Sequence, residues 1–145
     1  HFNLSHSGDM GLIGLNRRVP IGVDVECTTR EVETSDIVER FFAPAEREVW
    51  QDIPPVESNA AFYRAWTRKE AYVKARGDGL SHDSSRYAIT FREVDRSKLL
   101  VDEIDPTAPA RYKVIPVAAP PDYEAACVLQ ISPQIPVELN LHSWT

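Results

Sequence analysis

The sequence has little cysteine and no long apolar run, and each shortage excludes a class of protein. Its 145 residues include only Cys27 and Cys127, whose separation fits neither a zinc site nor a redox pair, so we expect two buried thiols. No apolar run approaches the length of a membrane span, and the first residues lack the basic and apolar regions of a signal peptide. These absences predict a cytoplasmic protein without a membrane partner.

Positive charge is also scarce. The chain has 16 Lys and Arg against 22 Asp and Glu, and a net charge of −6. Broad electrostatic capture of nucleic acid depends on a basic face that releases counterions, so we expect no nucleic-acid partner. Apolar residues, by contrast, make up 43% of the chain, enough to bury the core of one globular domain.

Turn-forming residues and apolar periodicity divide the chain into short strands and helices. One helix is predicted to start at Ser35, whose hydroxyl would cap it, and a second runs from Pro44 through Trp50. The longest helix is predicted over residues 59–76. Strands are predicted over residues 2–5, 11–15, 21–26, 87–91, 110–117 and 124–131.

The long helix has a signal at each end and an apolar face. Asn59 can cap its free N–H groups, and Gly77 can close its C-terminus in the left-handed conformation. Apolar residues recur at helical spacing and are predicted to face the core. They are Phe62, Ala65, Trp66, Tyr72 and Val73.

Residues 21–26 read I-G-V-D-V-E, an alternation that sends the aliphatic side chains to one face of a strand and two acids to the other. Asp24 and Glu26 would then lie side by side, where like charges repel unless a cation or water lies between them. A strand with one face in water shows the same alternation. The pattern alone therefore leaves a metal site and a solvated face both open.

Two further groups of polar residues carry chemistry. Glu70 and Lys74 are four apart on the long helix, in the order that favours an ion pair, and a surface pair is the simplest interpretation. Ser5, His6 and Ser7 offer hydroxyl and imidazole groups at a turn, where they are suited to holding a phosphate oxygen. A serine nucleophile is not indicated, because no third partner has a natural placement.

Three carboxylates on two elements, with a lysine one turn away, suggest chemistry at phosphorus. Magnesium prefers oxygen ligands and often bridges one or two carboxylates to substrate phosphates. The set of Asp24, Glu26, Glu70 and Lys74 therefore fits phosphoryl-type transfer. A magnesium-dependent nuclease has similar needs, but the acidic balance of the chain disfavours it.

Four segments in order carry the most specific signal in the chain. They read F-N-L-S-H-S, I-G-V-D-V-E, R-F-F-A-P-A-E and F-Y-R-A-W-T-R-K-E-A-Y-V-K-A-R-G-D-G-L. The series resembles the surfactin-synthetase type of 4′-phosphopantetheinyl transferase, closely over residues 2–80 and in general shape beyond. The resemblance implies an α+β fold, a 4′-phosphopantetheinyl transferase-like half in which an antiparallel sheet packs against a long helix.

The resemblance also implies an activity. Enzymes of this type transfer the 4′-phosphopantetheine group from coenzyme A to a serine of an acyl or peptidyl carrier protein, with Mg²⁺, and release 3′,5′-ADP. By similarity, Asp24, Glu26 and Glu70 hold the metal. Glu70 and Lys74 are the implied catalytic residues, the first accepting the serine proton and the second neutralising the pyrophosphate. The implied coenzyme A-binding residues are Ser5, His6, Asp24 and Lys74.

The same resemblance predicts how the chain is divided. Residues 1–18 would be the terminal strands of an otherwise missing N-terminal half, residues 19–132 the C-terminal half, and residues 133–145 a tail. A preceding half or self-association would complete the site, and an apolar surface along residues 2–15 is expected where it packs. A non-catalytic fragment that retains only a metal or coenzyme A half-site is the alternative.

Overall fold

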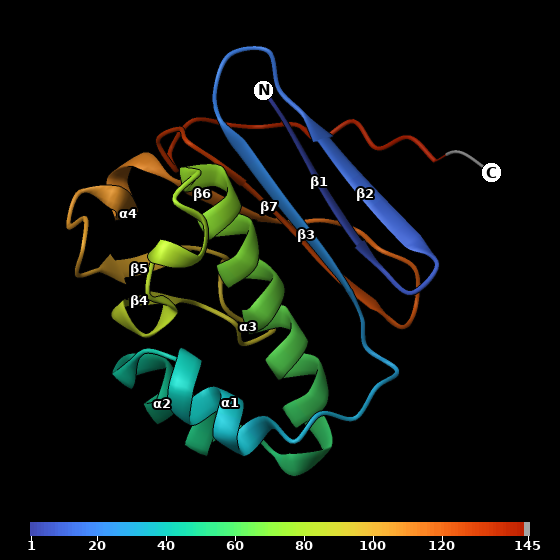
Figure 1. Ribbon diagram of the computed structural model, residues 1–145, viewed down its shortest axis with the longest axis vertical. Helices are drawn as coiled ribbons and strands as arrows, with labels where there is room; N and C mark the ends of the chain where they lie inside the picture. Colours follow the sequence, from blue (N-terminus) through green and yellow to red (C-terminus); the bar gives the residue numbers. More distant parts are fainter. Residues whose placement is uncertain (144–145) are drawn as a thin grey trace.

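The computed structural model describes residues 1–143, apart from the side chain of Leu80, and in it one long helix crosses a three-stranded sheet (Figure 1). The strands are β1 (Phe2–Ser7), β2 (Met10–Leu15), β3 (Ile21–Cys27), β4 (Tyr87–Ile89), β5 (Leu99–Asp102), β6 (Lys113–Pro116) and β7 (Tyr123–Leu129). The helices are α1 (Thr34–Phe41), α2 (Pro44–Gln51), α3 (Pro55–Arg76) and α4 (Ala108–Arg111), with 3₁₀ turns η1 (Gly79–Ser81) and η2 (Ser84–Arg86). The predicted α+β class is confirmed.

The central sheet has the antiparallel order β3-β7-β6, and α3 lies across one of its faces. Small residues on both sides allow the helix to lie close to the sheet: Ala71 of α3 and Ala126 of β7 are both fully buried. Tyr72 and Val128 belong to the same core cluster. The predicted packing of an antiparallel sheet against a long helix is therefore confirmed.

The β1–β2 hairpin forms a sheet of its own beside β3 (Figure 1). Leu12 of β2 packs against the cluster that Ile21 and Val23 form on the face of the sheet opposite α3. Gly14 lies so close to this cluster that a Cβ there would be 2.6 Å from Val23 Cγ1. The hairpin thus covers the aliphatic face of β3, as the alternation of that strand requires.

The long helix differs from its prediction at the N-terminus. It starts at Pro55, because proline is tolerated in the first turn, and Asn59 lies inside it, donating its side-chain N–H to the Thr28 carbonyl at 2.8 Å. Gly77 closes the helix with φ of 79°, as predicted. Neither α3 nor any other helix within residues 1–143 is long and apolar enough to cross a membrane.

The buried surface of α3 is wider than predicted and includes polar residues such as Thr67 and Lys69. Phe62, Ala65 and Tyr72 are buried, which confirms their place in the core. Trp66 and Val73 are only half-buried. Each packs against a core cluster, as predicted, and also lines a large open cavity along one side of the helix.

Several smaller predictions need correction. Ser35 lies inside α1 and makes no capping bond with its side chain. Cys27 is half-buried, with Sγ 3.2 Å from the Thr29 hydroxyl, because β3 ends there, whereas Cys127 is buried as expected. The segment predicted as one strand over residues 110–117 divides into the end of α4 and β6. Neither α4 nor β5 was predicted.

The segment after β7 is held by the sheet. Lys113 donates from Nζ to the carbonyl oxygens of Pro133 and Ile135, and Val137 packs against the cluster beneath β2. The start of the predicted tail, residues 133–145, is therefore anchored, and its last two residues lie outside the described part of the chain.

Candidate active site

The predicted division of β3 into an apolar and an acidic face is confirmed. Val23 lies in the cluster beneath the hairpin, whereas Asp24 is buried on the side of α3. Its Oδ1 accepts hydrogen bonds from Ser5 Oγ at 2.8 Å and from Lys74 Nζ at 2.7 Å. Glu26 follows two residues later and is half-buried. The acids are therefore part of a polar site and not a solvated strand face.

Lys74 links α3 to β3. Its Nζ donates to Asp24 Oδ1 and, at 3.1 Å, to the Val23 carbonyl. Among the ion pairs within residues 1–143, Lys74 pairs with Asp24 and not with Glu70. The interpretation of Glu70 and Lys74 as a surface ion pair is wrong, because a buried carboxylate in a less polar environment attracts the ammonium more strongly.

Gly22 makes this contact possible. A Cβ at this position would overlap the Ala71 carbonyl oxygen and the Ala75 nitrogen of α3. Only glycine lets the helix backbone lie directly on β3, and two residues further along the strand Asp24 then comes within reach of Lys74. The glycine of the I-G-V-D-V-E segment therefore positions the acid that follows it.

Glu70 lies one helical turn before Lys74 and is half-buried. Burial raises its pKa above the ordinary value, and the negative charge of Asp24 raises the pKa further. Burial also raises the pKa of Asp24, although hydrogen bonds from Lys74 and Ser5 lower it. Additional positive charge beside these two acids would therefore be favourable.

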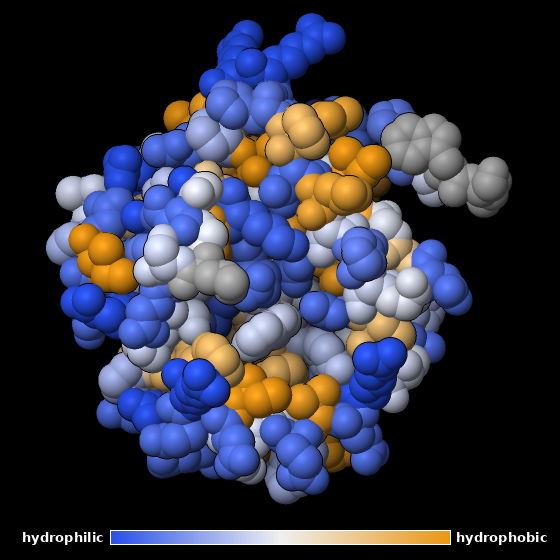
Figure 2. All heavy atoms as spheres, viewed as in Figure 1, coloured by the Kyte–Doolittle hydropathy of each residue, from blue (hydrophilic) through white to orange (hydrophobic). Residues whose placement is uncertain are grey.

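All six predicted site residues line one open cavity of about 990 Å³. Its wall is formed by β1, β3, α1, α3 and the segment from Gly79 to Tyr87. Figure 2 shows a mostly hydrophilic central region on this side of the molecule, with hydrophobic atoms gathered below it over α1 and α3. The predicted residues that meet here from three elements are Ser5, His6, Asp24, Glu26, Glu70 and Lys74.

The fit of a metal ion depends on the free carboxylate oxygens. Asp24 Oδ2 is buried and has no hydrogen-bond partner among the described residues, an unusual position for a charged oxygen and one that a cation would satisfy. Within residues 1–143, however, no three acidic, histidine or cysteine side chains are close enough to hold an ion by themselves. The residues fit an ion that is completed by substrate oxygens and water, the usual way Mg²⁺ is bound.

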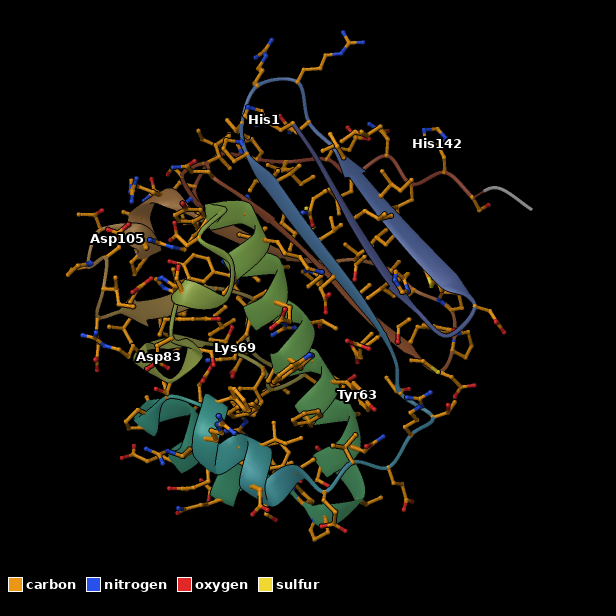
Figure 3. All side chains as sticks on the ribbon, viewed as in Figure 1. His1, Tyr63, Lys69, Asp83, Asp105 and His142 are labelled. Carbon is orange, nitrogen blue, oxygen red and sulfur yellow. The ribbon has the colours of Figure 1, made fainter. Side chains whose placement is uncertain are left out.

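Lys69, next to Glu70, was not among the predicted site residues. Lys69, labelled in Figure 3, is buried on α3. It pairs with Glu46 of α2, with 2.6 Å between Nζ and Oε2, and it also donates to the Tyr87 carbonyl. Glu46 in turn accepts the backbone N–H groups of Ala43 and Ile89. A buried Lys–Glu pair has no periodic signature in sequence, so only packing reveals it.

Aromatic residues at the lower edge of the cavity were also missed. Phe41 and Trp66 meet edge to face, with ring centroids 5.9 Å apart, and the Arg40 guanidinium lies 5.2 Å from the Phe41 centroid. All three line the cavity. The signal for α1 was present in the R-F-F segment, but which ring faces the cavity depends on how α1 meets α3.

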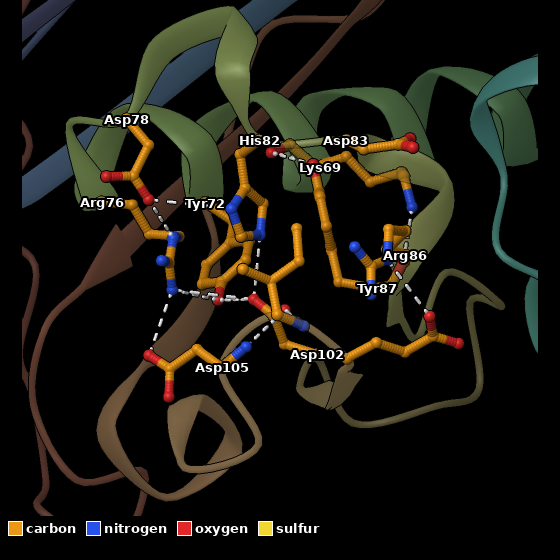
Figure 4. A network of polar contacts seen from close by, with 12 residues as sticks. Lys69, Tyr72, Arg76, Asp78, His82, Asp83, Arg86, Tyr87, Asp102 and Asp105 are labelled. Carbon is orange, nitrogen blue, oxygen red and sulfur yellow. Dashed lines mark hydrogen bonds and ion pairs between the residues drawn. The ribbon is translucent and has the colours of Figure 1, made fainter.

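A buried polar network holds the far wall of the cavity (Figure 4). Asp102 of β5 is fully buried and accepts hydrogen bonds from Tyr72 at 2.5 Å and His82 at 3.0 Å. Although burial acts to raise the pKa of Asp102, hydrogen bonds from Tyr72 and two backbone N–H groups hold it below its ordinary value. The segment after α3 is thus tied to the helix through His82.

The protein family of this chain follows from its sequence. Residues 20–128 match the profile of the 4′-phosphopantetheinyl transferase superfamily. The chain belongs to this superfamily. The match includes β3 and α3, the elements that supply Asp24, Glu26, Glu70 and Lys74.

Curated relatives are similar to this superfamily member at moderate identity. The 4′-phosphopantetheinyl transferase HetI of Nostoc sp. is 33% identical over 115 residues, which cover 79% of this chain and 43% of HetI. The 4′-phosphopantetheinyl transferase psf-1 of Bacillus pumilus is 33% identical over 132 residues, 90% of this chain and 46% of psf-1. Sfp of Bacillus subtilis is 28% identical over 144 residues, which cover 99% of this chain and 61% of Sfp. The chain thus spans about half the length of these relatives, and the similarity to Sfp supports the surfactin-synthetase type.

Solved structures show the same fold. The holo-[acyl-carrier-protein] synthase of Thermotoga maritima matches with a TM-score of 0.59 and 20% identity over 79% of this chain and 64% of that one. A holo-(acyl-carrier-protein) synthase of Bacillus anthracis, in complex with CoA (3′,5′-ADP), also has a TM-score of 0.59 at 20% identity, and 98% of that chain is covered.

Proposed function

We propose that this chain transfers the 4′-phosphopantetheine group from coenzyme A to a serine of an acyl or peptidyl carrier protein and releases 3′,5′-ADP. The observation that carries the proposal is the convergence of six polar residues from β1, β3 and α3 on one cavity in a superfamily member. The cavity is also of a suitable size, because small-molecule sites usually measure about 300–1,000 Å³.

Coenzyme A would enter with its pyrophosphate against Lys74, the cation beside Asp24. The ammonium has three donors, and Asp24 and the Val23 carbonyl use two of them. The third remains for a phosphate oxygen. His6 is exposed on β1 at the same cavity and supplies a further donor, while Ser5 acts mainly through its bond to Asp24.

Glu70 is the proposed general base. Its raised pKa makes it a better proton acceptor than an ordinary carboxylate. The carrier serine oxygen forms a bond to the β-phosphorus of coenzyme A, its proton passes to Glu70, and the bond from that phosphorus to the bridging oxygen of the pyrophosphate breaks, so that 3′,5′-ADP leaves. Lys74 faces the charge that develops on 3′,5′-ADP.

Asp24, Glu26 and Glu70 are the proposed ligands of Mg²⁺, and the unpartnered Asp24 Oδ2 supports this assignment. Bound Mg²⁺ would supply charge neutralisation at the pyrophosphate. The residues themselves hold the acids in place: Ser5 and Lys74 bind the other oxygen of Asp24, so that only Oδ2 is free.

Replacement of Glu70 tests the proposal. Glu70→Gln retains size and hydrogen bonding but removes the charge and the basicity, so transfer should fall about a hundredfold or more. The measurement is mass-spectrometric detection of holo-carrier formed from apo-carrier, coenzyme A and saturating Mg²⁺. Glu57→Gln, on an exposed turn of the same helix, is the matched control and should leave transfer unchanged. Wild-type turnover by Glu70→Gln would remove Glu70 from the mechanism.

A half-site that binds coenzyme A without turnover is the second candidate, and it is favoured by the lack, within residues 1–143, of three side chains close enough to hold a metal ion by themselves. Calorimetry separates the two. A wild-type chain that binds coenzyme A but forms no holo-carrier alone, and gains activity with a complementary half, is a half-site. Wild-type transfer by the chain alone excludes it.

The domain division stays part of the proposal. Residues 1–18 would close an N-terminal half, residues 19–132 form the C-terminal half, and residues 133–145 follow as a tail. A cytoplasmic location is proposed with it, since a carrier protein and coenzyme A must meet the enzyme in one compartment.

A further inference from the structure

The edge of β3 that faces β1 is bound by side chains instead of a backbone ladder. Three alternate side chains of β1 each accept one N–H group of β3, so the edge keeps its hydrogen bonds without strand pairing. The bonds are Val23 N to Asn3 Oδ1 at 2.9 Å, Val25 N to Ser5 Oγ at 3.3 Å, and Cys27 N to Ser7 Oγ at 3.0 Å.

Two of these side chains have a second partner. Ser5 Oγ donates to Asp24 Oδ1 and Ser7 Oγ donates to Glu26 Oε2, each at 2.8 Å. A serine hydroxyl has a single hydrogen to donate. The β3 N–H group occupies one lone pair of the serine oxygen. The hydroxyl hydrogen therefore points at the carboxylate of the β3 residue just before that N–H group. Asn3, the remaining one of the three, has no hydrogen bond to an acidic side chain among the described residues.

We propose that Ser7 is a positioning residue for Glu26 in the metal site. Glu26 is half-buried on β3 and has a long side chain with several rotamers. Ser7 holds one carboxylate oxygen, Oε2, and leaves Oε1 free for a cation. The inference rests on the proposed function, because it concerns the proposed ligand set of Asp24, Glu26 and Glu70.

Ser7 is better suited to a test than Ser5. Ser5 lines the cavity and is a proposed coenzyme A contact, so its replacement would change two things. Ser7 is not among the described residues that line the cavity, but it contacts one that is, Glu26. An effect of Ser7 on the metal must therefore pass through Glu26.

The experiment measures binding of Mn²⁺ by electron paramagnetic resonance in the presence of coenzyme A, since Mn²⁺ accepts the same oxygen ligands as Mg²⁺ and the proposed ion is completed by substrate oxygens. Ser7→Thr keeps the hydroxyl, and Ser7→Val introduces a side chain of the same shape as threonine but without the hydroxyl. Replacing residues that orient metal ligands typically weakens binding about 10–100-fold. We expect the dissociation constant for Mn²⁺ to rise at least about tenfold in Ser7→Val and less than about threefold in Ser7→Thr.

Asn3→Ala is the matched control. It removes the same kind of bond to a β3 N–H group but touches no carboxylate, so it should lower the melting temperature without changing Mn²⁺ affinity. In transfer assays, Ser7→Val should need more Mg²⁺ for half-maximal rate and keep most of its rate at saturation. Should Ser7→Val lose its folded circular dichroism, Ser7→Ala replaces it in the comparison with Ser7→Thr.

The outcomes separate the inference from the proposed function. A wild-type protein that binds no Mn²⁺ with coenzyme A present removes the metal site and the inference with it. Wild-type binding with equal affinity in Ser7→Val, Ser7→Thr and Asn3→Ala leaves the metal site intact and overturns the role of Ser7. Equal weakening in Ser7→Val and Asn3→Ala also overturns it, because both would then act only by holding the strand.

Discussion

Glu70 combines burial with a neighbouring negative charge, and both raise its pKa above the ordinary value of 4.5. A general base works only when ionised, so transfer should decline as pH falls through this raised pKa. We expect the acid limb of the kcat/KM profile, measured at limiting Mg²⁺ where most of the protein is metal-free, to lie above pH 4.5 and to disappear in Glu70→Gln. An acid limb at or below the ordinary carboxylate range would contradict the role of Glu70.

The same shift has a consequence for stability. A pKa raised in the folded state means that protonated Glu70 stabilises the fold at low pH and that this contribution is lost as pH rises through the folded-state pKa. The ionised form of the group is therefore unfavourable to the fold. Glu70→Gln should leave the melting temperature unchanged or raised, and a clear decrease would show that the carboxylate stabilises the fold.

Gly22 tests whether close packing of α3 positions Asp24. Gly22→Ala inserts a methyl group into the backbone of α3 at Ala71, which the helix can avoid only by moving away from β3. Overpacking of this kind costs about 1–3 kcal/mol, measured by urea unfolding. Gly11→Ala is the control, because a Cβ there meets nothing within 4 Å. Equal stability of the two variants would show that the contact is not tight.

At the scale of elements, the Lys69–Glu46 pair joins α3 to α2 and to β4. Lys69→Met leaves the Glu46 carboxylate buried without its cation, and breaking such a pair costs about 3–5 kcal/mol. The double variant Lys69→Met/Glu46→Gln should lose less free energy of unfolding than Lys69→Met alone, because no charge is then left unpaired. Both are measured by urea unfolding.

An exposed pair provides the control for that comparison. Arg47 and Glu39 also join two helices, but the Glu39 side chain is 76% exposed, so Glu39→Gln should cost no more than about 1 kcal/mol. If Lys69→Met cost as little as Glu39→Gln, the buried pair would have no structural role.

At the scale of the whole molecule, the hairpin exposes an apolar face. Phe2 and Leu15 are cross-strand partners that are 76% and 74% exposed, and Leu4 and Ile13, the next apolar pair, are each 56% exposed. The sequence prediction of an apolar surface along residues 2–15 is confirmed, and Figure 2 shows hydrophobic atoms over β1 and β2. Such a face usually packs against a partner.

We expect this face to cause concentration-dependent self-association when the chain is alone. Phe2→Glu/Leu15→Lys should shift the sedimentation profile toward the monomer, because the charges must stay in water. A charged double variant at the exposed end of α3, Val56→Glu/Glu57→Lys, is the control and should sediment like the wild type. A wild-type chain that stays monomeric at all concentrations would contradict the expectation.

Much of the fold could be read from the sequence because local rules decide it. The alternation in residues 21–26 determined β3 and its two faces, Pro44 determined the start of α2, and Gly77 determined the end of α3. Residues 110–117 were misread, because a strand and a short helix can carry the same apolar pattern and their boundary depends on contacts with other elements.

The chemistry of the site was also present in the sequence, as acids, a lysine and hydroxyls in four ordered segments. Which of them bind one another was decided only by the tertiary structure. Lys74 lies four residues from Glu70 but pairs with Asp24, fifty positions away, because Gly22 brings the α3 backbone onto β3. Sequence spacing determines which residues share a face of one element. Packing between elements determines burial, and burial decides which charge an ammonium group binds.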